Sequence, residues 1–138
     1  MLTHQTEIRV RYADTDQMQF VYNGKYLEYF EIGRTELLRD HGLPYNYLEK
    51  QDYLLPVLEA YVRYLNPAYY DDLLIIDSVV KEMPTLKIHI DYKIVKKDSG
   101  EIVAEGFTKH VFMKKETKKV IKPPEFFINV LKPFFEKI

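Results

Sequence analysis

The sequence NGKYLEYFEIGRTELLRDH, residues 23–41, repeats its apolar residues with the period of an α-helix. Four residues form one stripe and two more widen it: Tyr26, Phe30, Gly33 and Leu37, with Leu27 and Leu38 beside them. Asn23 is suited to cap the start of such a helix, and Gly42 followed by Pro44 is a strong stop signal. The spacing therefore predicts one long helix over residues 23–41.

Strands flank this helix in the sequence. Before it, one face of an alternating segment carries Thr6, Ile8, Val10 and Tyr12, which is typical of a half-buried strand. After a short helix at residues 45–51, apolar segments predict strands over residues 53–65, 73–83, 87–96 and 102–113, and a last helix follows Pro123 and Pro124. Because these strands follow one another without intervening helices, we expect an α+β fold, with an antiparallel β-sheet wrapped around a long central α-helix.

The composition limits the class of protein. A chain of 138 residues suits a single domain over residues 1–138, and a formal net charge of -1 gives no general basic surface for nucleic acid. The absence of cysteine excludes disulfides, thiolate metal sites and cysteine nucleophiles. No apolar run approaches the ~20 residues of a membrane span, and no signal peptide is visible. These features predict a cytoplasmic protein.

Two carboxylates lie between the first strand and the long helix. Asp14 and Asp16 are two residues apart, and the backbone N–H groups at the start of the helix have no partners within it. Such N–H groups can stabilise an oxyanion while a nearby carboxylate acts as nucleophile or general base. The spacing alone favours a simpler interpretation, in which both aspartates only shape a turn.

The same segment resembles a known family. The matching stretches are Tyr12-Ala13-Asp14-Thr15-Asp16, Val21-Tyr22-Asn23-Gly24-Lys25-Tyr26, and residues 29–39, 55–57, 64–68 and 70–74. Through them the chain is similar, over nearly its whole length, to the hotdog-fold acyl-CoA thioesterases related to 4-hydroxybenzoyl-CoA thioesterase. The resemblance implies an acyl-CoA thioesterase that hydrolyses its substrate to a free acid and coenzyme A, without a metal or other cofactor.

The resemblance also implies roles for individual residues. Asp16 matches the catalytic aspartate of the family, and Asn23 lies where a backbone N–H polarises the thioester carbonyl. Tyr22 and Tyr26 are candidates to line the acyl pocket. Further along the chain, Thr85 and Lys87 lie where the family contacts the nucleotide part of coenzyme A. The expected assembly is a homodimer or homotetramer with its sites between subunits.

One departure from the family pattern concerns Gln19, which stands where many relatives have glycine. A glycine there would allow a positive φ or a close approach to the substrate, so Gln19 is expected to narrow the pocket or shift the loop. It leaves the acyl preference open, together with an alternative function as a non-catalytic acyl-thioester or partner-binding hotdog protein. The residues do not distinguish coenzyme A from acyl carrier protein as the carrier. Nor do they distinguish a nucleophilic from a general-base Asp16, or a dimer from a tetramer.

Histidine chemistry is not expected at this site. The four histidines are His4, His41, His89 and His110, and none lies in the loop or at the start of the helix. Dehydratases of the hotdog fold use a histidine with an acid, so the positions argue against that reaction. The scattered positions also give no metal-ligand spacing.

Overall fold

A five-stranded antiparallel sheet forms the centre of the computed structural model, which describes residues 1–136. Its spatial order is β1 (Leu2–Arg9), β4 (Leu73–Val80), β5 (Ile88–Lys96), β6 (Ile102–His110) and β3 (Val57–Tyr64). A second sheet joins β2 (Tyr53–Leu54), β7 (Phe112–Lys114) and β8 (Val120–Ile121). The helices are α1 (Lys25–Asp40), α2 (Tyr45–Lys50) and α3 (Glu125–Leu131), with 3-10 turns η1 (Tyr12–Asp14) and η2 (Lys132–Phe134). Within residues 1–136, no helix is both long and apolar enough to cross a membrane.

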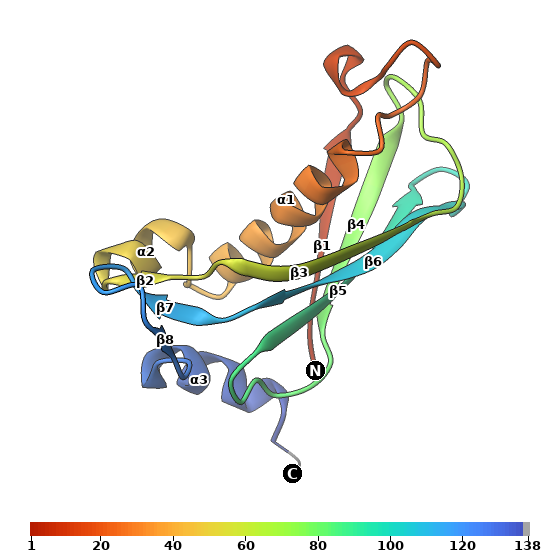
Figure 1. Ribbon diagram of the computed structural model, residues 1–138. Helices are drawn as coiled ribbons and strands as arrows, with labels where there is room; N and C mark the ends of the chain where they lie inside the picture. The colour runs from red at the N-terminus through yellow and green to blue at the C-terminus, as the bar shows by residue number, and fades with distance from the viewer. Residues whose placement is uncertain (137–138) are drawn as a thin grey trace.

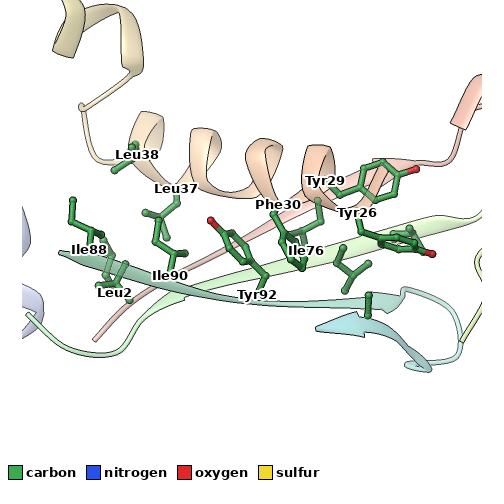
Figure 2. Close-up of a cluster of buried hydrophobic side chains, with 14 of the residues drawn as sticks. Leu2, Tyr26, Tyr29, Phe30, Leu37, Leu38, Ile76, Ile88, Ile90 and Tyr92 are labelled. Carbon is green, nitrogen blue, oxygen red and sulfur yellow. The ribbon is translucent and has the colours of Figure 1, made fainter. Parts of the chain in front are cut away.

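Helix α1 lies across one face of the large sheet (Figure 1). Figure 2 shows its apolar side chains pointing at the strands, and the Phe30 ring stacks on that of Tyr92 with their centroids 4.3 Å apart. Gly33 allows this close packing, because a Cβ there would lie 2.5 Å from Ser78 Oγ and 2.8 Å from Ile76 Cγ2. The stripe predicted from the helical period is therefore the face that α1 buries against the sheet.

Gly106 on β6 lies very close to both β3 and α1. An added Cβ on Gly106 would collide with the backbone carbonyl of Tyr61 on β3 and come within 3.0 Å of the Phe30 ring. Only glycine fits between the neighbouring strand and the helix at this point. In β5 the predicted alternation is confirmed, since Ile88, Ile90, Tyr92 and Ile94 are all buried.

The structure corrects several predicted boundaries. α1 has 16 residues and the sheet covers only one of its sides, so Leu27 is 43% exposed instead of widening the buried stripe. Tyr12 does not continue the first strand, because the chain turns into η1 and leaves the ring exposed. The strand predicted over residues 53–65 is divided between β2 and β3, and the one over 102–113 between β6 and β7. An antiparallel sheet combined with helices is nevertheless the predicted class of fold.

Strand β3 is an unprotected edge of the large sheet. It is the last strand in the spatial order, and seven of its eight residues are exposed. Large apolar side chains on it include Val57, Leu58, Tyr61 and Tyr64. An edge that is both long and apolar is a template for pairing with another chain.

Candidate active site

The loop that leads from η1 to α1 folds back on itself as a small hairpin. Thr15 bridges Val21, and the N–H of Asp16 donates to the carbonyl of Phe20 at 3.1 Å. A β-turn over residues 16–19 closes the tip, where the N–H of Gln19 donates to the carbonyl of Asp16 at 2.9 Å. The loop is therefore held by its own backbone hydrogen bonds and presents Asp16 at the first position of its turn.

The Asp16 carboxylate is half buried and only partly engaged. Its Oδ1 accepts a hydrogen bond from the N–H of Met18 at 2.9 Å, the local bond that aspartate commonly makes at the start of a turn. Among residues 1–136, no group donates a hydrogen bond to its Oδ2. One oxygen thus orients the side chain and the other is free to act on a substrate.

Gln19 takes the backbone conformation that glycine favours. Its φ is +70°, in the left-handed region, which is the usual arrangement for the last residue of a three-residue hairpin loop. A residue with a Cβ pays about 1–2 kcal/mol for this conformation. The side chain is exposed and does not line the groove described below. The loop therefore accommodates Gln19 by backbone strain, and its side chain does not narrow the groove.

Helix α1 begins at Lys25, after the start at residue 23 that the sequence predicted. Gly24, not Asn23, is the N-cap, and no side chain caps the helix. The carbonyl of Asn23 accepts hydrogen bonds from Tyr26 N–H at 3.3 Å and from the Tyr64 hydroxyl at 3.2 Å. Among residues 1–136, the N–H of Asn23 donates to no other group. It is thus a backbone donor at the positive end of a helix, free to bind an oxygen of a ligand.

A groove of about 440 Å³ brings these groups together. Its walls are formed by the hairpin, the start of α1 and the chain that follows β3: Asp16, Met18, Phe20, Val21, Asn23, Tyr26, Tyr64, Leu65, Asn66 and Pro67. Most of this lining is apolar, and Asp16 is the single acidic or basic side chain in it. Such a groove suits an uncharged apolar group held next to one carboxylate.

Tyr26 forms the buried wall of the groove. Burial raises the pKa of its phenol to about 12, and the neighbouring Tyr64 adds to the effect. The ring packs edge-on against Tyr64, with centroids 5.5 Å apart, and against Tyr29 at 5.7 Å. Tyr26 therefore stays neutral at physiological pH and acts as a rigid aromatic surface.

Asp14 has a different environment from Asp16. It is 2% exposed, and its carboxylate accepts hydrogen bonds from Arg11 N–H, Arg11 Nη2 and the Tyr29 hydroxyl at 3.0–3.1 Å. Burial alone would raise its pKa, but the bonds from Arg11 and Tyr29 outweigh burial, so the pKa of Asp14 is lower than usual. Asp14 is thus a satisfied internal carboxylate that does not line the groove.

Three of the residues expected to bind substrate lie away from this groove. Tyr22 is 50% exposed and is not part of the lining. Thr85 and Lys87 belong to the connection between β4 and β5, beside the start of β1, whereas the hairpin follows the end of β1. Since β1 has eight residues, about 25 Å of strand separates the two ends. Within one chain, these two residues and Asp16 do not share a site.

Sequence reasoning missed the partners of Asp14 and part of the groove. Tyr29 comes 15 residues after Asp14 in the chain, so no local pattern joins them. A tyrosine near the buried stripe of a helix does need a partner for its hydroxyl, and this need could have indicated that Tyr29 pairs with a polar group such as Asp14. Leu65, Asn66 and Pro67 enter the site only because Phe20 bridges Tyr69 and Val21 N–H donates to the carbonyl of Ala68.

Comparisons with known proteins identify the family of this chain. The model of the thioesterase-like superfamily matches residues 10–131. The Bacillus subtilis protein YneP, provisionally named an acyl-CoA thioesterase, is 34% identical over 116 residues, which cover 84% of this chain and 83% of YneP. The acyl-CoA thioester hydrolase YbgC of Escherichia coli O6:H1 is 33% identical over 88 residues, covering 64% of this chain and 66% of YbgC.

Solved structures share the fold. A DHNA-CoA thioesterase from Staphylococcus aureus superposes with a TM-score of 0.86 at 27% identity, covering 100% of this chain and 98% of that chain. A mutant 4-hydroxybenzoyl-CoA thioesterase in complex with 4-hydroxybenzoyl-CoA superposes with a TM-score of 0.84 at 17% identity, covering 94% and 99%. At that identity the second likeness concerns the fold alone.

Proposed function

This chain belongs to the thioesterase-like superfamily and is a thioester hydrolase of the hotdog fold. We propose that it hydrolyses acyl-CoA and that Asp16 acts as the nucleophile or general base of the reaction. One observation carries the proposal: the groove lined by apolar side chains contains both the Asp16 carboxylate and Asn23, whose N–H is free among residues 1–136. Thioester hydrolysis needs those two elements, a group that attacks or activates water and a donor for the oxyanion.

Two routes of hydrolysis are compatible with this placement. Either Asp16 Oδ2 attacks the thioester carbonyl, giving an acyl-aspartyl anhydride that water then hydrolyses, or Asp16 accepts a proton from the attacking water. In both routes the C–S bond breaks, and the coenzyme A thiolate leaves and takes up a proton. The carbonyl oxygen becomes negative at the tetrahedral stage, and the N–H of Asn23 at the start of α1 stabilises it.

The lining of the groove supports an acyl substrate without charge. Phe20, Leu65 and Pro67 offer apolar surface, Tyr26 closes one wall, and no basic side chain is present to pair with an acidic acyl group. A second carboxylate beside Asp16 would be repelled. We therefore place the acyl group in this groove. Coenzyme A, the carrier in the names of the relatives, would then lie outside the groove.

A homodimer built on β3 would bring a second subunit next to the groove. If β3 pairs antiparallel with a second copy of itself, its apolar residues become covered and its free backbone groups gain partners. The end of one β3 at Tyr64, which borders the groove, then lies beside the start of the partner's β3. In such an assembly, Thr85 and Lys87 can contact coenzyme A only from another subunit. Sedimentation equilibrium tests this arrangement, and a monomer at all concentrations would exclude it.

Free-thiol release tests the proposed reaction. The wild-type protein is offered straight-chain and aromatic acyl-CoAs, and the rates are compared with those of Asp16→Asn. We expect release by the wild type and a loss of about 10²-fold or more in the variant, since positioned acid–base groups supply about 10²–10⁴-fold. Asp98→Asn, in the exposed turn between β5 and β6, is the matched control. Equal rates for Asp16→Asn and wild type would refute the proposal.

A further inference from the structure

Within residues 1–136, Asp14 is the only buried carboxylate. It joins the end of β1 to the first turns of α1. Toward β1 and η1 it accepts hydrogen bonds from the backbone N–H of Arg11 at 3.0 Å and from Arg11 Nη2 at 3.1 Å. Toward α1 it accepts one from the Tyr29 hydroxyl at 3.0 Å, and Lys25 Nζ lies 3.6 Å from Oδ1. A single side chain therefore ties the strand end to the helix.

The backbone of Asp14 holds the other end of the hairpin. Its carbonyl accepts a hydrogen bond from the N–H of Tyr22 at 2.9 Å, and the next residue on each side forms the bridge between Thr15 and Val21. The following peptide group carries the N–H of Asn23, and its own carbonyl, that of Tyr22, accepts from Lys25 N–H at 2.9 Å. The base of the hairpin that presents Asp16 and the free N–H of Asn23 are thus fixed by the same residue.

We propose that Asp14 and Tyr29 are positioning residues for the hydrolysis, which set the location of the Asp16 carboxylate relative to the Asn23 N–H. The proposal rests on the function proposed above. Neither side chain lines the groove, so neither contacts the acyl group placed there. They act by holding the hairpin against α1, because a bound carbonyl carbon must meet the carboxylate while its oxygen meets the N–H. A displacement of about 1 Å in such an arrangement can lower a rate by about 10²-fold.

Two conservative substitutions remove the contact from either side. Asp14→Asn keeps the shape of the side chain and loses its charge, and Tyr29→Phe removes only the hydroxyl. We expect kcat to fall by about 10- to 100-fold in the first and by less in the second, with KM changing little because the groove lining is intact. The matched control is Tyr92→Phe, which also removes a buried tyrosine hydroxyl, hydrogen-bonded to Thr108 at 2.7 Å within the core. It should be less stable but keep its kcat.

A double-mutant cycle separates positioning from a general loss of structure. If Asp14 acts through Asp16, then adding Asp14→Asn to Asp16→Asn should cause little further loss of the residual rate. All rates are measured well below the melting temperature of each variant. Full kcat in both Asp14→Asn and Tyr29→Phe would overturn the proposal. It would also be overturned if Asp14→Asn lowered the rate by the same factor in the wild type and in the Asp16→Asn variant.

Amide hydrogen exchange tests the positioning without any turnover. We expect Tyr29→Phe and Asp14→Asn to speed exchange in residues 15–23 while the strands of the large sheet keep their protection. Unchanged exchange in residues 15–23 in both variants would overturn the proposal even if thiol release is never seen. Conversely, an active enzyme that keeps its rate in Asp16→Asn refutes the proposed role of Asp16, whereas hydrogen exchange still reports whether Asp14 and Tyr29 hold the hairpin, so the two failures are distinguishable.

Discussion

His110, the last residue of β6, has a fully buried imidazole with 0% exposure. Its Nε2 pairs with Thr108 Oγ1 at 2.8 Å, which in turn pairs with the Tyr92 hydroxyl at 2.7 Å. Burial, together with the positive charge of Arg34 on α1, lowers the pKa of His110 to about 4. The ring is therefore neutral in the native protein at any pH above about 4.

This lowered pKa predicts that the protein loses stability in acid. In the unfolded chain a histidine takes up a proton near pH 6.5, whereas in the folded chain His110 does so only near pH 4. The unfolded state binds more protons between these values, so the stabilisation is complete above about pH 6.5 and is lost as the pH falls toward 4. Each pH unit in this interval corresponds to about 1.4 kcal/mol, and the whole interval to about 3 kcal/mol.

The substitution His110→Gln removes the titrating group and keeps a polar partner for Thr108. We expect the variant to be less stable than the wild type at pH 7, with the difference shrinking by about 3 kcal/mol as the pH approaches 4. Urea unfolding at fixed protein concentration between pH 4 and 7 measures this. His89 on β5 has an exposed imidazole, so His89→Gln controls for the loss of an imidazole as such. Parallel pH profiles for wild type and His110→Gln would refute the reasoning.

Two further predictions concern backbone positions. Gln19→Gly should raise the free energy of unfolding by up to about 1 kcal/mol, because relief of the left-handed backbone strain exceeds the added freedom of the unfolded chain. Urea unfolding measures the difference, and a less stable variant would contradict the presence of strain at Gln19. Gly33→Ala should lower the free energy of unfolding by about 1–2 kcal/mol, because crowding of Ser78 and Ile76 outweighs the better helix propensity of alanine. A more stable variant in the same assay would contradict this and would show that β4 can shift away from the added methyl group at little cost.

Much of the fold follows from periodicity in the sequence. The helical spacing around Phe30 and Leu37 and the alternation around Ile90 each identified a buried face correctly, because both faces are apolar over their whole length. The errors occur where the chain changes direction. Tyr12 continues the alternation of the first strand, yet the 3-10 turn over Tyr12–Asp14 takes it out to solvent. Leu27 was expected to be buried, but it is exposed. The width of the buried stripe depends on what covers α1, and the helical period alone does not specify that.

The candidate site shows a sharper limit of sequence reasoning. Asp16 and Asn23 come together in one groove, as the resemblance implied, because both lie near the join of hairpin and helix. Thr85 and Lys87 do not join them, since strand register places the β4–β5 connection at the other end of the sheet. Strand pairing relates residues about 70 positions apart, and no local pattern fixes which end of the sheet a loop will occupy.

The Asp14-Thr15-Asp16 step shows why residue type alone does not reveal a role. Both aspartates favour turns equally, yet Asp14 enters η1 and is turned inward onto Tyr29, while Asp16 starts the next β-turn and keeps one oxygen free among the described residues. The difference depends on a hydroxyl on α1, which reaches the loop only after the helix has packed on the sheet. A carboxylate with three hydrogen-bond donors cannot easily leave its place to act on a substrate, whereas one with a single donor can. The proposed chemistry therefore uses the less satisfied aspartate, and the proposed role of the more satisfied one is to hold it in position.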